Sequence, residues 1–230
     1  MVRMAHHEPP SADRPEGETA GESAGDERRA PVGSKDGRRR TRRHDPGRKT
    51  HILDATLDVI ADHGVAGTTH RHIAARAGVP LGSITYHFTS LADLQAQAFA
   101  RYVELQSAVF EALFEGVGTR EQFLDVLVDL VHGGPARHRS AVLGFELHLA
   151  ALRNPALRAL TQAWTQDSCA VLARFTDPDG AARLDALLEG MIMHALLAIA
   201  PQSRDGTREA IDRTLGPAGR PRSTQAAAAP

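Results

Sequence analysis

The chain has 230 residues, a formal net charge of −1 at pH 7 and a single cysteine. This length is enough for one or two domains with an apolar core, and a lone cysteine excludes an intramolecular disulfide framework. The first residues lack the apolar run of a secretory signal. Residues 181–200 form the longest apolar stretch but carry three charged side chains, so no membrane span is expected and the cytoplasm is the expected location.

The charges are distributed unevenly along the chain. Residues 28–49 hold ten Lys or Arg side chains and two Asp, whereas residues 1–27 hold two Arg and seven acidic side chains. A basic block beside a folded segment is either a solvated tail or an arm that contacts a polyanion, and composition leaves both alternatives open. Residues 1–44 and 216–230 contain few large apolar side chains, so we expect both to be disordered tails.

Between the tails, apolar side chains recur every three or four positions, which indicates amphipathic helices and no strands. Asp45 and Pro46 are typical of a helix start, and Gly64 is typical of a helix end. The run DPDG at residues 177–180 predicts a tight turn. In chain order, the predicted helices cover residues 46–63, 69–77, 80–87, 91–109, 120–132, 140–152, 155–175, 181–200 and 207–215.

Residues 68–88, TTHRHIAARAGVPLGSITYHF, have the pattern of a helix-turn-helix motif, with two short helices around a glycine-containing turn. Ala74 and Ala77 are small enough to let the two helices approach closely, and Gly78 accepts the left-handed conformation of the turn at low cost. The second helix would expose hydroxyl and methyl groups, which can contact base edges, thymine methyls and phosphates.

The longer stretch DATLDVIADHGVAGTTHRHIAARAGVPLGSITYHFTSLADLQAQAF resembles the DNA-binding domain of the TetR family of bacterial transcriptional regulators. The resemblance covers about residues 48–99 and includes the G-x-x-x-T-T entry, the I-A-x-x-A-G-V core and the Y-H-F ending. It implies an all-α protein of about nine or ten helices. A three-helix DNA-binding domain would occupy residues 45–92, with the motif at 69–88, and a helical effector-binding and dimerisation domain would occupy residues 93–215.

The resemblance also assigns roles to single residues. Thr69, Tyr86 and His87 match phosphate-contacting positions, Leu81 and Ser83 match base-facing ones, and Arg71 matches a position that reaches a base or a phosphate. The full set of expected DNA-contacting residues is Arg48, Thr69, Arg71, Leu81, Ser83, Thr85, Tyr86 and His87.

Two positions depart from the family pattern. Thr85 stands where an aromatic residue is common, and Leu91 stands where many members have a phosphate-contacting Lys. The basic block could compensate for the missing contact, because each neutralised phosphate adds salt-dependent affinity. Next to a DNA-binding domain, the arm is therefore the favoured interpretation of residues 28–49.

The C-terminal helices are expected to enclose a small-molecule effector. Aromatic, imidazole and thioether side chains are the candidates for its pocket, with ordinary core positions as the alternative. These candidates are Phe110, Phe114, Phe145, His148, Trp164, Met191 and His194. Cys169 is expected to be an inert core residue, and neither a cofactor nor a metal ion is expected. The helices at 155–175 and 181–200 are expected to form the homodimer interface.

The sequence thus predicts a homodimeric repressor that binds a palindromic operator in double-stranded DNA and is released by a small-molecule effector. The fourth helix, which bridges the two domains, is the expected transmitter. The alternatives are an activator or an effector-independent repressor of the same fold, and a helical interaction protein without DNA binding. An enzyme is not expected, since no G-x-S-x-G, P-loop, H-E-x-x-H, C-x-x-C or G-x-G-x-x-G motif occurs.

Overall fold

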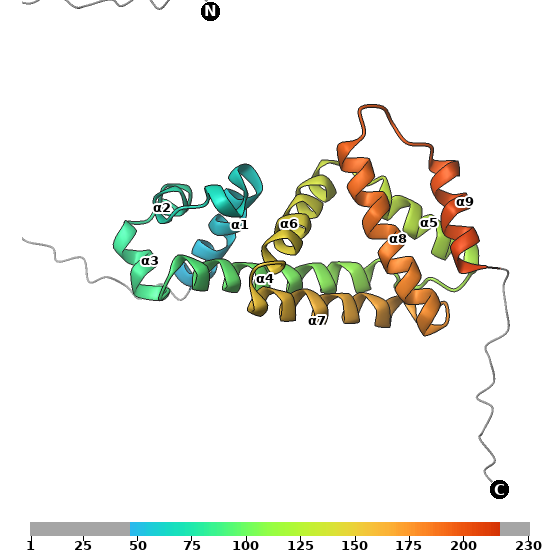
Figure 1. Ribbon diagram of the computed structural model, residues 1–230, viewed down its shortest axis with the longest axis horizontal. Helices are drawn as coiled ribbons and strands as arrows, with labels where there is room; N and C mark the ends of the chain where they lie inside the picture. Colours follow the sequence, from blue (N-terminus) through green and yellow to red (C-terminus); the bar gives the residue numbers. More distant parts are fainter. Residues whose placement is uncertain (1–46, 217–230) are drawn as a thin grey trace, which may run out of the picture. The chain divides into compact units, whose positions relative to one another are not determined.

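The computed structural model describes residues 47–216, and within them the chain forms nine α-helices and no strand (Figure 1), which confirms the all-α prediction. The helices are α1 (Arg48–Gly67), α2 (His70–Ala77), α3 (Leu81–His87), α4 (Leu91–Ala112), α5 (Arg120–Val131), α6 (Pro135–Ala151), α7 (Pro155–Leu172), α8 (Pro178–Leu197) and α9 (Arg204–Leu215). None of these helices is long and apolar enough to cross a membrane.

Several predicted helix boundaries were wrong by a few residues. Helices α6, α8 and α9 begin three to five residues earlier than expected, and α7 ends at Leu172 instead of residue 175. The run at residues 177–180 is not a separate turn, because Asp177 is the N-cap of α8 and its Oδ1 accepts a hydrogen bond from the backbone N–H of Gly180 at 2.7 Å. Pro178 then occupies the first helical turn, where its missing N–H costs nothing. The expected cap at Asp45 and Pro46 lies outside the described residues.

Helix α1 is broken near its end, at the glycine that was expected to terminate it. Gly64 has φ 71° and ψ 169°, and the chain resumes a helical course to Gly67. This backbone conformation is almost exclusive to glycine. The break exposes the backbone N–H of Val65, which donates a hydrogen bond to Glu146 Oε2 of α6 at 2.8 Å. A distant helix therefore caps the kink.

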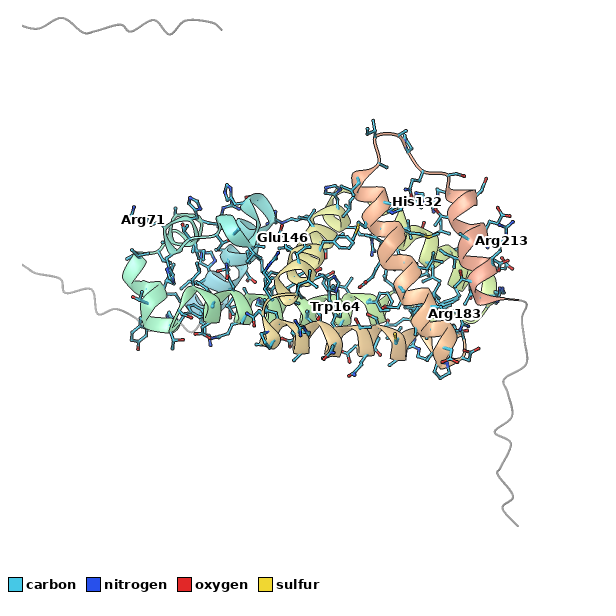
Figure 2. All side chains as sticks on the ribbon, viewed as in Figure 1. Arg71, His132, Glu146, Trp164, Arg183 and Arg213 are labelled. Atoms are coloured by element: carbon cyan, nitrogen blue, oxygen red, sulfur yellow. The ribbon has the colours of Figure 1, made fainter. Side chains whose placement is uncertain are left out.

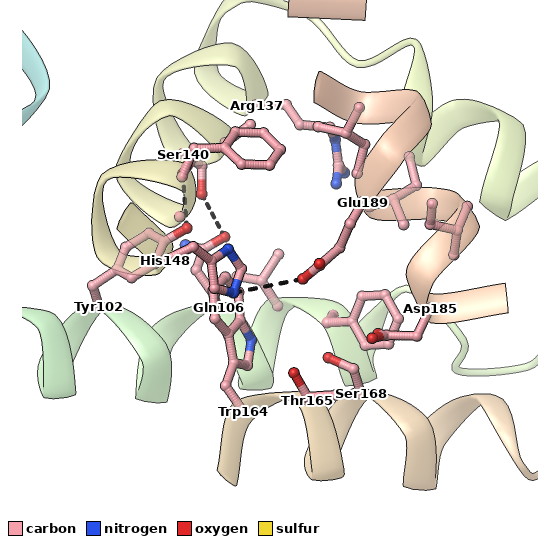
Figure 3. A pocket seen from close by; sticks show the side chains of 18 of the residues that line it. Tyr102, Gln106, Arg137, Ser140, His148, Trp164, Thr165, Ser168, Asp185 and Glu189 are labelled. Carbon is pink, nitrogen blue, oxygen red and sulfur yellow. Dashed lines mark hydrogen bonds and ion pairs between the residues drawn. The ribbon is translucent and has the colours of Figure 1, made fainter. Parts of the chain in front are cut away.

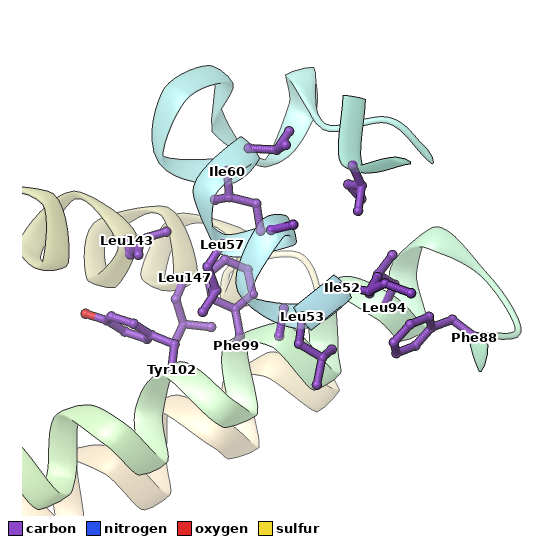
Figure 4. Packing of buried hydrophobic residues seen from close by; sticks show 14 of the residues in the cluster. Ile52, Leu53, Leu57, Ile60, Phe88, Leu94, Phe99, Tyr102, Leu143 and Leu147 are labelled. Atoms are coloured by element: carbon purple, nitrogen blue, oxygen red, sulfur yellow. The ribbon is translucent and has the colours of Figure 1, made fainter. Parts of the chain in front are cut away.

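The apolar core has two parts. The first lies among α1–α4 and continues into α6 and the start of α7, so the helix-turn-helix end does not have a core of its own (Figure 4). Its fully buried side chains include Ile52, Ile60, Phe99 and Leu147. The second part joins the end of α4 to α5, α8 and α9 and contains the buried Phe114, Leu127 and Leu184. Helix α4 contributes to both parts and runs alongside α7 (Figure 1).

Helix α6 is also held to α1 by charged groups. Arg139 of α6 pairs with Asp58 and Asp62 of α1, and the same two carboxylates pair with Arg76 of α2. Together with the Glu146 bond, these pairs mean that α6 contacts α1 through two polar positions, and the buried Leu143 between them belongs to the first core.

We expect Gly64→Ala to lower the free energy of unfolding by about 1–3 kcal/mol, because an L-residue is strained at this φ and ψ. The new Cβ would also lie 3.3 Å from Glu146 Oε1. Urea unfolding followed by circular dichroism measures the change. Gly82→Ala is the control, since Gly82 is in α3 with open space where its Cβ would be, and it should leave stability unchanged or raise it by up to about 1 kcal/mol. Equal losses for both variants would contradict the prediction.

Candidate functional site

The helix-turn-helix is built as its sequence predicts. Thr69 caps α2, its hydroxyl accepting a hydrogen bond from the backbone N–H of His72 at 3.2 Å. Gly78 is left-handed, with φ 60° and ψ 32°, and turns the chain toward α3. Ile73 and Ile84 are fully buried and hold α2 and α3 on the first core. The position of α3 is therefore fixed by the core behind it, while its opposite face is open to solvent.

The open face of α3 carries most of the expected DNA-contacting side chains. Tyr86 is 77% exposed and Leu81 is 46% exposed, whereas Ser83 and His87 are half-buried. Thr85 is exposed, and its hydroxyl donates to the backbone oxygen of Gly82 at 3.3 Å. The side chains of Leu81 and Tyr86 are therefore accessible to another molecule.

The two arginines of α2 differ in their surroundings. Arg76 pairs with Asp58 and Asp62, so its charge is already neutralised inside the protein. Arg71 is exposed, and its guanidinium forms no ion pair or hydrogen bond with any residue in the described part (Figure 2). Only Arg71 is thus free to pair with an external anion such as a phosphate.

The start of α1 adds further positive charge beside this surface. Arg48 is half-buried in the first turn, and Lys49 lies over the ring of Phe88 with its Nζ 5.7 Å from the ring centroid. The sequence analysis did not single out Lys49. Leu91, a departure from the family pattern, packs against the first core and so serves the fold. Most of the basic block at residues 28–49 lies outside the described residues.

A cavity lies among α4, α6, α7 and α8 (Figure 3). It contains about 900 Å³ of unfilled space, part of which is open to solvent. Four of the expected pocket residues line it: Phe110, Phe145, His148 and Trp164. Phe114 lies outside it, because it is 1% exposed and packs in the second core against Phe123 and Phe175. Met191 and His194 line a separate hollow between α8 and the start of α9.

One wall of the cavity is held by a chain of polar contacts. Tyr102 of α4 donates a hydrogen bond to the backbone oxygen of Ser140 at 2.7 Å, and the Ser140 hydroxyl bonds Gln106 Oε1 at 2.6 Å. Burial raises the pKa of Tyr102 to about 12, so its hydroxyl stays protonated. His148 stacks on Trp164, with 5.8 Å between ring centroids, and its Nε2 lies 3.6 Å from Glu189 Oε1.

Two carboxylates from α8 complete the cavity, and the sequence analysis missed both as site residues. Burial, and then the charge of Glu189, raise the pKa of Asp185 to about 6. Asp185 forms no hydrogen bond or ion pair within residues 47–216. Burial lowers the pKa of Arg137, which also lines the cavity, and raises that of the nearby Cys169 thiol. The available signal was the four-residue spacing of Asp185 and Glu189, which places both on one face of an apolar helix.

The histidines do not assemble into a metal centre in the part of the chain that the structure describes. His63 and His72 are ring neighbours, 5.3 Å apart between centroids. Across residues 47–216, however, no group of three or more His, Cys, Asp or Glu side chains could hold a metal ion.

Comparisons with known proteins agree with this arrangement. Residues 52–98 match the family model of bacterial regulatory proteins of the TetR family, and residues 118–217 match the model of a tetracyclin repressor-like C-terminal domain. The transcriptional regulator PksA from Bacillus subtilis is 24% identical over 176 residues, which are 71% of this chain and 86% of PksA.

Solved structures extend the similarity to nearly the full length of several relatives. SCO7518 from Streptomyces coelicolor A3(2) is 43% identical with a TM-score of 0.68, covering 75% of this chain and 100% of that one. The multidrug binding protein EbrR in complex with ethidium is 37% identical with a TM-score of 0.64, covering 74% and 99%. SCO1917 from Streptomyces coelicolor A3, a TetR family member, is 37% identical with a TM-score of 0.63 and the same coverage. With its helix-turn-helix and all-α C-terminal part, the chain belongs to the TetR family of DNA-binding transcriptional regulators.

Proposed function

We propose that this regulator is a homodimeric, non-enzymatic repressor in the cytoplasm that binds a palindromic operator and is released by a small-molecule effector. The observation that carries the DNA-binding half is the unpaired Arg71 beside the open face of α3. An exposed cation next to hydroxyl and apolar groups suits a phosphate backbone and the adjacent base edges. The other expected DNA-contacting residues remain part of this proposal.

The cavity supports the effector half of the proposal. It is bounded by aromatic rings and a few polar groups, as ligand pockets generally are. The relative EbrR has been solved in complex with imidazole, ethidium, proflavin and malachite green. We assign the effector contacts to Phe110, Phe145, His148 and Trp164, together with the cavity-lining groups that the sequence analysis missed.

We further propose that α6 shares the transmitter role expected of α4. Ser140, Gly144 and Phe145 of α6 line the cavity, while Arg139 and Glu146 of the same helix hold α1. A ligand that binds more tightly when α6 is in one of two positions would shift the protein toward that position. Because α6 contacts α1, the shift would also move α1 and change the orientation of α3. Helix α4 also contributes to both cores, so the proposed domain boundary near residue 92 lies within the first core and not between the two.

The dimer is proposed to form through the helices at 155–175 and 181–200. In support of this, α8 exposes Met193 at 42% and Leu197 at 75%, which water alone would not favour. A two-fold dimer presents two copies of α3 to successive major grooves, about 34 Å apart, and this geometry requires a palindromic operator. An activator or an effector-independent repressor would use the same surfaces, and assay of transcription in the presence and absence of effector separates these alternatives.

The DNA surface is tested with Arg71→Ala and with operator DNA selected from a random double-stranded pool by the full-length protein. We expect weaker binding and a slope of log K against log salt that is shallower by about 1, the loss of one phosphate contact. Arg213→Ala is the control, since Arg213 is also exposed but lies on α9, away from α2 and α3 and outside the proposed dimer interface (Figure 2). Equal effects of the two substitutions would argue against the assigned surface.

The role of the basic block is tested by deleting residues 1–43, which removes eight of the ten basic side chains of residues 28–49. If the block contacts DNA as an arm, the shortened chain binds the same operator more weakly, and its salt dependence is flatter because fewer counterions are released. The measurement is fluorescence anisotropy of labelled operator across a salt series. A shortened chain with the wild-type slope would make the block a solvated tail.

The proposed role of α6 is tested with Glu146→Ala, which removes the acceptor for the Val65 N–H. We expect a loss of about 1–3 kcal/mol in unfolding free energy from the unpaired group. We also expect weaker operator binding, although Glu146 is remote from α3. Glu115→Ala removes an exposed carboxylate that has no partner in the described part, and should change neither quantity. Reduced stability with unchanged operator binding would show that the Glu146 contact does not orient the DNA-binding helices.

A further inference from the structure

Some of the charged groups around the cavity lie near an opposite charge, and one does not. The groups that face it are Arg137 and His148 from α6, Asp185 and Glu189 from α8, and the protonated Tyr102 from α4. Glu189 lies within 3.6 Å of His148. Arg137 is attracted to Asp129, a carboxylate that does not line the cavity. Asp185 is left without any partner in the described part of the chain.

An unpaired carboxylate in this position is unfavourable for the protein alone. Asp185 is half-buried in a cavity that Trp164 and Leu188 also line, and its nearest charged neighbour on α8 is Glu189, which has the same sign. Loss of hydration without a compensating partner costs free energy, and a like charge one turn away adds to that cost. A bound positive charge would remove both penalties at once.

We propose that the cavity selects an aromatic cation, whose positive charge lies against Asp185 and whose ring packs beside Trp164. This inference rests on the proposed function, since it names the chemical class of the effector. Indole is the most favourable ring for a cation, and Trp164 carries His148 stacked on one of its faces, while Phe110 and Phe145 supply further aromatic surface. In Figure 3, Asp185 and Glu189 reach the cavity from α8 and Trp164 from α7, so the charged and aromatic groups enclose the same space.

The test uses the full-length protein and probes that differ mainly in charge. Tetraphenylphosphonium is a permanent cation, tetraphenylborate is an anion of nearly the same shape, and triphenylphosphine oxide is neutral; benzyltrimethylammonium is a smaller cation. Calorimetry should show that at least one cation binds, and that Asp185→Asn weakens it about tenfold. Asp179→Asn, which changes an exposed carboxylate in the first turn of α8 that does not line the cavity, should leave the affinity unchanged.

Thermal unfolding separates lost affinity from lost folding. Because the pKa of Asp185 is raised from 3.8 to about 6 in the folded protein, the native state is destabilised as pH rises through that interval. Asp185→Asn removes this penalty, so the variant should melt at a higher temperature than the wild type at pH 7.5, with the gain disappearing below pH 4. A variant that is more stable and still binds the cation poorly supports the proposal.

Three outcomes would overturn the inference: neither cation binds, Asp185→Asn binds the cation as tightly as the wild type, or the neutral or anionic probe binds as tightly as the cation. Anion binding that Arg137→Gln abolishes would assign the cavity to an anion instead. Operator release is measured in parallel. If a cation binds in an Asp185-dependent way but does not release the operator, the inference stands and the proposed function is contradicted. If the neutral or anionic probe releases the operator, the proposed function stands and the inference is contradicted.

Discussion

The packing of α6 against α1 is the constraint on which the rest of the structure depends. Leu147 is fully buried in the core that also holds the helix-turn-helix, and Glu146 beside it caps the kink at Gly64. Because the DNA-binding helices have no separate core, α2 and α3 depend on α6 and α7 for their position. One helix thus contacts the DNA-binding end and also forms a wall of the cavity, so the two sites share α6.

The distribution of charge follows from the same packing. Asp58 and Asp62 of α1 neutralise both Arg76 of α2 and Arg139 of α6, which leaves Arg71 as the unpaired arginine of α2. These pairs are exposed and individually weak, but as a network they hold three helices in register. At the cavity the opposite holds, since the carboxylate of Asp185 has no hydrogen-bond or ion-pair partner among residues 47–216. Within residues 47–216, α2 therefore presents the unpaired Arg71 toward the proposed DNA surface, and α8 presents the unpaired Asp185 toward the proposed ligand.

The candidate pocket shows that helical periodicity does not distinguish residues that line a cavity from residues that fill the core. Phe110 of α4 and Phe114, just beyond the end of that helix, are four residues apart and have the same apolar character, yet Phe110 lines the cavity and Phe114 is enclosed by Phe123 and Phe175. A repeat of three or four residues identifies the face of a helix that is buried. It does not reveal whether the opposing helix fills the space or leaves it empty. The sequence also did not indicate that Asp185 lines a cavity. Its charge indicated only that residues 181–200 do not span a membrane.

The sequence by itself determined the all-α class, eight of the nine helix positions to within a few residues, and the helix-turn-helix, because caps, glycines and apolar spacing are local signals. It also identified the family, through motifs that lie within about fifty residues. Only the tertiary structure decided that α6 begins five residues early to reach α1, that Arg71 is free while Arg76 is paired, and that Asp185 lines a cavity. Each of these depends on contacts between residues far apart in the chain, and one sequence does not specify such pairings.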